Sequence, residues 1–123
     1  MGRSRLLLVE NDRHLVDGLR RYFEASGRFE IVHCTATADS AIRWLGQHPQ
    51  GWDLALIDIF LDAGHGYAVL KHCRKFDPRQ RVVMMSNYAR GEAVEQALAQ
   101  GADRFFDKAT ELDQLLAYCL GQP

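Results

Sequence analysis

The sequence predicts an α/β fold in which a five-stranded parallel sheet is wound on both sides by helices. Apolar runs of strand length alternate with segments of helical periodicity, and no long linker separates them. The run at residues 54–57 is apolar on both faces, which is typical of a central parallel strand. Five such βα units are most commonly arranged in the strand order 2-1-3-4-5. We therefore expect one doubly wound domain that covers residues 1–123.

The first βα unit begins with a strand at Arg5–Val9. Apolar residues at helical spacing predict a helix after it, and Gly27 is placed to end that helix. The residues of its apolar face are Leu15, Leu19, Tyr22 and Phe23. The second strand, Phe29–Thr35, has β-branched and alternating character, and we expect it near an edge of the sheet.

The second and third units follow the same pattern. Thr37 is a candidate cap for a short helix that carries Ala41 and Leu45 and ends before Gly46. The third strand is Asp53–Asp58, and a Gly-rich loop at 62–66 follows it. The next helix is expected to run until Asp77-Pro78 closes it. Its residues at helical spacing are Tyr67, Leu70, Cys73, Arg74 and Phe76.

The last two units complete the sheet with strands at Arg81–Met85 and Arg104–Asp107. The helix between them ends at Gly101, and its expected apolar residues are Ala93, Val94, Ala97 and Leu98. Thr110 opens the final helix, where Thr110 and Asp113 have the spacing of a capping box. That helix presents Leu112, Leu115, Leu116 and Leu120 on one face.

The composition is that of an ordinary globular chain, because 47% of its 123 residues are hydrophobic and 25% are charged. The formal net charge of −1 and the absence of a basic block argue against direct binding of nucleic acid or an anionic membrane. The sequence has neither an apolar run of membrane-spanning length nor a signal peptide. Cys34, Cys73 and Cys119 match no zinc or disulfide pattern, so we expect buried or half-buried thiols in a cytoplasmic protein.

Residues suited to phosphate chemistry stand where four of the strands end. They are Glu10 and Asn11 after the first strand, Asp58 in the third, Ser86 after the fourth and Lys108 after the fifth. Ligands of an open parallel α/β sheet bind beyond the carboxyl ends of its strands, so these side chains should share one crevice. Such a crevice could hold a divalent metal beside a carboxylate and receive a phosphoryl group.

In this order, on these elements, the pattern resembles the receiver domain of two-component response regulators, a CheY-like fold, over nearly the whole chain. The matching positions are Glu10-Asn11, Asp58, Gly66, Ser86 and Lys108. The resemblance implies that Asp58 is the phosphoacceptor and that Ser86 and Lys108 assist it. It also implies a Mg²⁺ ion, with no other cofactor, held by Glu10, Asn11, Asp58 and the backbone carbonyl of Phe60.

Elementary chemistry is compatible with these roles. Asp58 is a carboxylate nucleophile that would form an acyl phosphate, and the transition state of phosphoryl transfer requires a cation and oriented donors. A few carboxyl and carbonyl oxygens with water suit Mg²⁺. Lys108 would pair with a phosphoryl oxygen as a point charge, and Ser86 would hydrogen-bond another. By the resemblance, the aromatic Phe105 would follow Ser86 as a rotameric switch, although it can also be core filler.

The resemblance implies a signalling switch and not a turnover enzyme. A histidine kinase or phosphotransfer protein would donate the phosphoryl group, and small acyl phosphates would substitute for it. Phosphorylation would change the face formed by the fourth helix, the fifth strand and the fifth helix. That face would serve a homodimer, a fused output domain or a target protein. Its candidate surface residues are Arg90, Glu95, Phe105, Asp113 and Tyr118.

Several of these residues also have a purely structural interpretation. Asp12 is better placed to cap the first helix than to bind metal, and Glu10 could stabilise the same helix end. Ser86 could cap the helix that follows it, and Lys108 could be a solvated surface lysine. His65, in the loop beside the site, is better explained as a solvent-exposed side chain than as a catalytic one.

The chain departs from the family pattern at three places in the crevice. Asn11 stands where the family usually has an acidic metal ligand, so we expect weaker Mg²⁺ binding. Ala109 stands where a cis proline is typical, and a cis bond before Ala costs about 3–4 kcal/mol. We therefore expect a trans bond, a rearranged loop and a less fixed Lys108. Asp62 replaces another usual proline, which predicts a looser loop after the third strand.

Two aromatic residues flank the expected path of the water that would hydrolyse an acyl phosphate. Phe60 and Tyr88 each lie two residues beyond a site residue, Asp58 and Ser86 respectively. Aromatic rings would exclude water, and they offer no amide or carboxylate to orient it. We therefore expect a long-lived acyl phosphate.

Two other functions remain to be weighed. A degenerate receiver that binds a protein partner independently of phosphorylation is suggested by Asn11 and Ala109, although Asp58, Ser86 and Lys108 are all retained. A flavodoxin-like electron carrier would share the topology. Its phosphate loop should be rich in hydroxyl groups and glycine, whereas this chain has Glu10-Asn11-Asp12, which would repel a phosphate.

Overall fold

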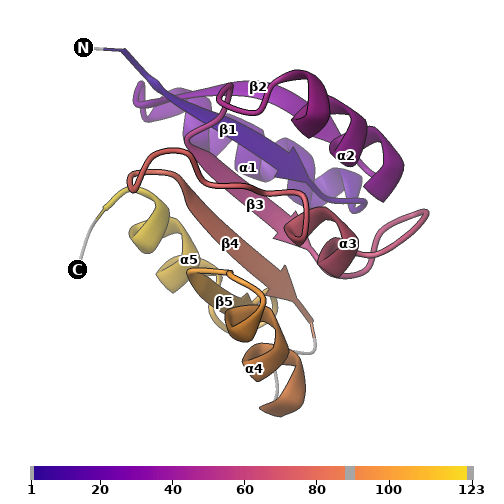
Figure 1. The fold of residues 1–123 in the computed structure, drawn as a ribbon. Coiled ribbons are helices and arrows are strands. Elements are labelled where there is room, and N and C mark those ends of the chain that lie inside the picture. The colour runs from indigo at the N-terminus through magenta and orange to yellow at the C-terminus, as the bar shows by residue number, and fades with distance from the viewer. Residues whose placement is uncertain (1, 88–90, 122–123) are drawn as a thin grey trace.

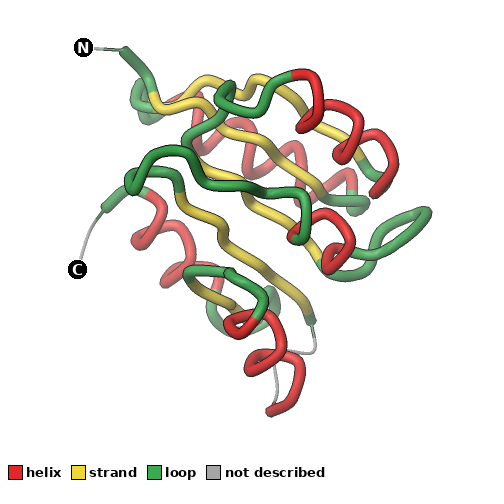
Figure 2. Tube along the Cα trace, viewed as in Figure 1, coloured by secondary structure: helices red, strands yellow, loops and turns green. Residues whose placement is uncertain are grey.

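A computed structural model describes residues 2–87 and 91–121 of the chain. Within them, five parallel strands form one sheet in the spatial order β2-β1-β3-β4-β5 (Figures 1 and 2). The strands are β1 (Ser4–Val9), β2 (Phe29–Thr35), β3 (Leu54–Asp58), β4 (Arg81–Ser86) and β5 (Arg104–Asp107). The helices are α1 (Arg13–Ala25), α2 (Ala38–Gln47), α3 (Gly66–Leu70), α4 (Gly91–Ala99) and α5 (Leu112–Cys119). The predicted doubly wound (βα)5 architecture, with β2 at an edge, is confirmed.

The core is divided into two layers by the sheet, because successive side chains of a strand point to opposite faces. Leu7 and Val9 of β1 lie in the core layer that includes residues of α2, α3 and α4, whereas Leu6 and Leu8 lie in the layer that includes residues of α1 and α5. These four side chains are completely buried. Helices on both faces explain why the central strands are apolar throughout and do not alternate. The two layers can be followed in Figure 1.

Several predicted helix ends are confirmed by hydrogen bonds. The Asp12 carboxylate accepts from the backbone N–H groups of His14 and Leu15 at 3.0 and 3.3 Å, which caps α1. Gly27 follows the end of α1 with a φ of 70°, a conformation that glycine adopts without strain. The Thr37 hydroxyl accepts from Ser40 N–H at 3.3 Å and caps α2.

The prediction for α3 was wrong in its length. The helix ends at Leu70, and the chain from Lys71 to Gln80 has no regular helix. The side chain of Gln80 explains part of this difference, because its Oε1 accepts from the N–H groups of Phe76 and Asp77 at 2.6 and 3.1 Å. Those two donors would otherwise be available to continue helical hydrogen bonding.

Two details of the C-terminal helices also differ from expectation. No side chain caps α5, which begins after Glu111, so the capping box expected for Thr110 and Asp113 is absent. Thr110 instead donates its backbone N–H to the Asp107 carboxylate at 3.2 Å. In α4, Leu98 is 46% exposed, and Ala97 is the buried residue.

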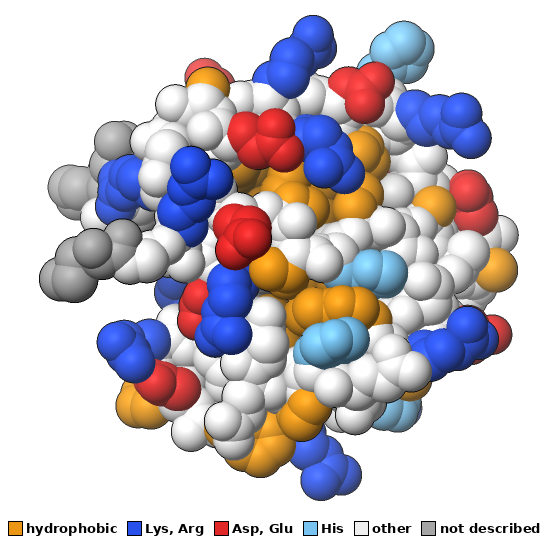
Figure 3. All heavy atoms as spheres, turned by 90° about the horizontal axis from the view of Figure 1, so that it is seen from above, with side chains coloured by type: hydrophobic (Ala, Val, Ile, Leu, Met, Phe, Trp, Pro, Cys, Tyr) orange, Lys and Arg blue, Asp and Glu red, His pale blue; other side chains and the backbone are white. Residues whose placement is uncertain are grey.

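The surface agrees with the near-neutral charge of the chain. On the face seen in Figure 3, acidic and basic side chains are interspersed, and hydrophobic surface gathers beside histidine side chains near the middle. None of the helices in the described part of the chain is long and apolar enough to cross a membrane. Cys119 is buried and both Cys34 and Cys73 are half-buried free thiols, as predicted.

Candidate functional site

Three charged side chains meet at the carboxyl edge of the sheet. The Nζ of Lys108 lies 2.9 and 3.2 Å from the two carboxylate oxygens of Glu10 and 3.4 Å from Oδ2 of Asp58. The side chains of Glu10 and Asp58 are 0% and 3% exposed, and that of Lys108 is 10% exposed. Residues up to 98 positions apart in the chain therefore form one almost completely buried ionic cluster.

The parallel sheet accounts for this convergence. Glu10 directly follows β1, Asp58 is the last residue of β3, and Lys108 directly follows β5. Ser86 ends β4 and is fully buried. Its carbonyl accepts from Lys108 N–H at 2.9 Å, which joins the ends of β4 and β5. The sequence-predicted residues Glu10, Asp58, Ser86 and Lys108 are thus brought to one edge, as expected.

The electrostatics of the cluster are set by two acids that share one lysine. Burial and, second, the charge of Glu10 raise the pKa of Asp58 to about 6, and Lys108 opposes this rise. Burial by itself lowers the pKa of Lys108, but its hydrogen bond to Glu10 and the charges of both acids raise that pKa above its usual value. At neutral pH the lysine is therefore a cation, and most Asp58 side chains are ionised.

This donor set suits a hard divalent cation. When both carboxylates are ionised, Lys108 neutralises only one of the two negative charges, and the second remains in a buried environment. Glu10 and Asp58 offer carboxylate oxygens, which Mg²⁺ prefers. The described residues contain no group of three or more His, Cys, Asp or Glu side chains that could hold a metal ion together. Further ligands would therefore come from the Asn11 amide, backbone carbonyls or water.

Asn11 lies beside this pair but is engaged elsewhere. Its amide nitrogen donates to Oδ1 of Asp62 across the mouth of the site at 3.4 Å. Asp12 faces the helix that it caps, and its backbone N–H donates to Oε2 of Glu10 at 2.8 Å. The structural interpretation of Asp12 is confirmed. The contact between Asn11 and Asp62 joins two of the positions at which the chain departs from the family pattern, which the sequence did not reveal.

The loop after β3 is shaped by Gly66. A Cβ at this position would lie 2.3 Å from the backbone oxygen of Asp58, so no side chain fits unless the backbone moves. The Gly66 N–H donates to the Ile59 carbonyl at 2.8 Å, which holds the loop against β3. Phe60, which is 57% exposed, and the exposed His65 lie in this loop.

The expectation that the loop after β5 is rearranged and holds Lys108 less firmly stays a prediction. No cis peptide occurs in the described residues, so the bond between Lys108 and Ala109 is trans, as predicted. The loop is nevertheless well tied, because Asp107 Oδ1 accepts from Ala109 N–H at 2.7 Å and Glu111 Oε1 accepts from Asp107 N–H at 2.9 Å. The loop thus forms these bonds, and Lys108 pairs with Glu10, although no proline follows Lys108.

Phe105 is half-buried and packs against the core layer beneath α4. It pairs with Met84 in the register of β4 and β5, two residues before Ser86. On the neighbouring surface, Arg81 and Arg104 lie over the ring of Tyr118, with guanidinium carbons 5.1 and 4.8 Å from its centroid. The sequence pointed to Tyr118 but not to its two cationic partners. Glu95 and Asp113 are exposed as expected, and Tyr88 and Arg90 lie outside the described residues.

Comparison with known proteins identifies the class of protein to which this fold belongs. The family model of the response regulator receiver domain matches residues 6–119. The regulatory protein AtoC of Escherichia coli (strain K12) is 31% identical over 113 residues, which are 91% of this chain and 23% of AtoC. The uncharacterized transcriptional regulatory protein YhcZ of Bacillus subtilis (strain 168) is 28% identical over 111 residues, which are 89% of this chain and 51% of YhcZ.

Solved structures agree with this similarity. A CheY-like response regulator receiver domain protein from Methanospirillum hungatei JF-1 has a TM-score of 0.80 at 26% identity, over 98% of this chain and 93% of that one. The CheX-CheY-BeF3-Mg complex from Borrelia burgdorferi contains a chain with a TM-score of 0.82 at 24% identity, over 96% of this chain and 87% of that one. At this identity the second likeness concerns the fold alone.

The chain belongs to the response regulator receiver domain family of two-component systems. The resemblance drawn from the sequence is therefore confirmed. Receiver domains act as signalling switches that interact with histidine kinases and output domains, and they generally bind Mg²⁺ at the phosphorylation site. The chain spans about a quarter of the length of AtoC and about half that of YhcZ.

Proposed function

We propose that residues 1–123 form one receiver domain that takes a phosphoryl group from a histidine kinase or phosphotransfer protein onto Asp58. The observation that carries the proposal is the buried cluster in which Asp58 lies 3.4 Å from the Lys108 ammonium group beside Glu10. A scaffold would gain little from a second acid held beside one lysine, because burying an incompletely compensated charge is unfavourable.

Phosphoryl transfer would use Asp58 as the nucleophile. A carboxylate oxygen of Asp58 forms a new O–P bond while the N–P bond of the donor phosphohistidine breaks, and the released imidazole nitrogen keeps the electron pair. With a pKa of about 6, Asp58 is mostly ionised at pH 7 and competent to attack. Lys108 already reaches Asp58 and would move its ammonium contact to a phosphoryl oxygen.

Mg²⁺, when bound, supplies positive charge that offsets the charge developing on the transferred phosphoryl oxygens. Glu10, Asp58, the Asn11 amide oxygen and the Phe60 carbonyl are the groups that would hold it. The Asn11 amide supplies no charge and its nitrogen is bonded to Asp62, so we expect binding weaker than an aspartate at position 11 would give.

The phosphorylated state would be transmitted through β4 and β5. Ser86, buried at the end of β4, would hydrogen-bond the phosphoryl group, and the half-buried Phe105 on the neighbouring strand would change its packing. The face of α4, β5 and α5 would then bind a second copy of the chain, an output domain or a target protein.

Two contacts favour a second function, a module that binds its partner without phosphorylation. The Asn11–Asp62 contact and the Lys108–Glu10 pair give the site internal partners in the absence of metal. The two functions differ in whether Asp58 accepts a phosphoryl group.

Intact-mass spectrometry after incubation with acetyl phosphate or phosphoramidate, with Mg²⁺ or with EDTA, decides between them. We expect a single phosphoryl adduct that requires Mg²⁺, disappears in Asp58→Asn and persists in Asp62→Asn, which removes an exposed acid next to the site. An unmodified mass under every condition would reject the phosphoacceptor and leave the phosphorylation-independent module.

A further inference from the structure

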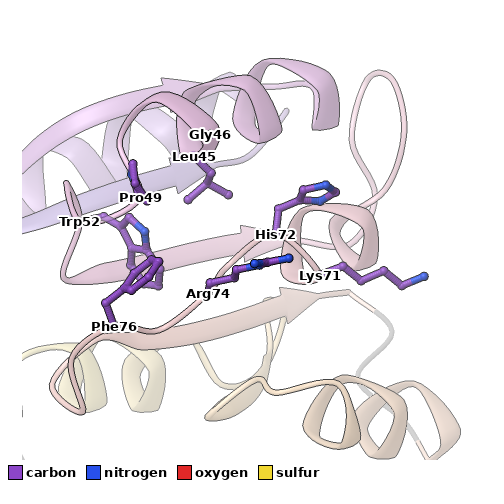
Figure 4. A pocket seen from close by; sticks show the side chains of 8 residues that line it. All are labelled: Leu45, Gly46, Pro49, Trp52, Lys71, His72, Arg74 and Phe76. Carbon is purple, nitrogen blue, oxygen red and sulfur yellow. The ribbon is translucent and has the colours of Figure 1, made fainter.

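A second pocket lies on the α2 and α3 side of the sheet and extends from Trp52 to Lys71 and His72, which follow α3. Trp52 precedes β3, whereas Asp58 is its last residue. The pocket has a volume of about 440 Å³ and opens between the end of α2 and the segment after α3 (Figure 4). It is lined by Leu45, Gly46, Pro49, Trp52, Lys71, His72, Arg74 and Phe76. This volume is within the usual range for small-molecule sites, about 300–1,000 Å³.

The pocket is a consequence of the early end of α3. The chain from Lys71 to Phe76 leaves helical geometry and passes in front of β3, and the end of α2 forms the opposite wall (Figure 4). Phe76 is 55% exposed, although Trp52 on the same side of the pocket is almost fully buried. Phe76 therefore presents an apolar ring to solvent at the pocket, whereas Trp52 and Leu45 lie almost fully buried beneath its surface.

The buried indole of Trp52 favours a ligand that carries a hydrogen-bond acceptor. Trp52 is 1% exposed, and its indole Nε1 has no hydrogen-bond partner among the described residues. An indole N–H can only donate, so this buried group lacks an acceptor. Figure 4 shows the indole nitrogen on the edge of the ring that faces the α2 side of the pocket.

The charges in the pocket have one sign. The described lining residues include Lys71 and Arg74 but no acid, and neither cation forms an ion pair with a described residue. Arg74 extends across the pocket below Leu45, whereas Lys71 points outward at the rim (Figure 4). The guanidinium of Arg74 can form two parallel hydrogen bonds to a carboxylate.

We propose that this pocket binds an organic carboxylate with a ring-sized apolar body. The body would lie against Leu45, Trp52 and Phe76, its carboxylate would pair with Arg74, and a ligand oxygen would accept from the Trp52 indole. The site is distinct from the phosphorylation crevice and does not depend on the function proposed for it.

Titration of the ¹⁵N-labelled chain with 4-phenylbutyrate, followed by the indole N–H signal of Trp52 in ¹H–¹⁵N correlation spectra, tests the proposal. Trp44 gives the only other indole signal expected from this sequence, and Trp44→Phe assigns the two. We expect a saturable shift of the Trp52 signal. Arg74→Gln should weaken binding about tenfold, the usual scale for a lost charged hydrogen bond. Arg43→Gln, the same change on the exposed side of α2, should leave it unaltered.

Two further ligands identify which part of the molecule is recognised. 4-Phenylbutanamide keeps the ring and removes the charge, and inorganic phosphate keeps a charge and removes the ring, so both should bind much more weakly. No shift at Trp52, equal affinity of acid and amide, equal affinity of phosphate, or equal affinity in Arg74→Gln would each overturn the assignment. The Arg74 and Arg43 variants alter side chains at the surface, and the remaining amide signals report whether the fold is intact.

Discussion

Asp58 is expected to destabilise the metal-free fold, and replacing it should show by how much. Its pKa rises from 3.8 to about 6 in the folded chain, so the folded state binds a proton more tightly than the unfolded state does. The contribution of Asp58 to the free energy of unfolding is then most favourable when Asp58 is protonated. This contribution falls as the pH rises from about 4 through about 6. Above pH 7 Asp58 is ionised in both states, and the free-energy cost of its buried charge is fully present.

The penalty follows from the size of the shift. Each pKa unit corresponds to about 1.36 kcal/mol, so a shift of roughly two units costs about 3 kcal/mol at pH 8. Asp58→Asn removes the buried charge but keeps a polar group whose burial is also unfavourable. We therefore expect the variant to gain about 1–3 kcal/mol in the free energy of unfolding at pH 8.

Urea unfolding in EDTA at pH 4, 5, 6, 7 and 8 provides the assay. The difference in the free energy of unfolding between Asp58→Asn and the natural chain should be small at pH 4, grow between pH 4 and 6, and stay constant above pH 7. Asp17→Asn, which changes an exposed acid on α1, is the control and should give a small difference at every pH. A loss of stability in Asp58→Asn at pH 8, or a gain of equal size at pH 4, would refute the electrostatic account.

Three other predictions concern the same edge of the sheet. Asn11→Asp should tighten Mg²⁺ binding by about tenfold, measured by quenching of intrinsic fluorescence or by calorimetry, and an unchanged affinity would contradict the role given to Asn11. Phe60→Asn, alone and with Tyr88→Glu, should speed decay of the phosphoryl adduct followed by intact mass; equal decay rates would rule out shielding by the rings. Gly66→Ala should cost about 1–3 kcal/mol of stability in urea, because its Cβ would approach the Asp58 oxygen to 2.3 Å. Gly18→Ala, in α1 where an added Cβ would meet open space, should instead gain up to about 1 kcal/mol.

The strands and the site at their ends were the most predictable features of the chain. Residues 54–57 have to be apolar on both faces because helices cover both sides of the sheet, and this leaves a clear signal in the sequence. Asp58 then stands out as a buried acid at the end of such a run. The parallel topology places Glu10 and Lys108 beside it without further information.

The features that escaped prediction depend on contacts between distant residues. Helical spacing continued through Cys73 and Arg74, but the Gln80 side chain takes the N–H groups of Phe76 and Asp77, which no local pattern reveals. The capping box expected at Thr110 is absent for a similar reason, because the backbone N–H of Thr110 donates to the Asp107 carboxylate. The ion pair between Lys108 and Glu10 joins residues 98 positions apart, so local loop chemistry does not reveal it either.

Asn11 connects the stability and the metal affinity of the site. An aspartate at this position would add a third acid near a lysine that already pairs with two, so the metal-free Asn11→Asp chain should be less stable at pH 8 than the natural one. Saturating Mg²⁺ should reverse that order, because a ligand that binds only the folded state stabilises it more strongly the tighter it binds. Urea unfolding of both chains in EDTA and in excess Mg²⁺ measures the two orders directly. If Asn11→Asp is at least as stable as the natural chain in EDTA, the uncompensated negative charge inferred for this cluster is not there.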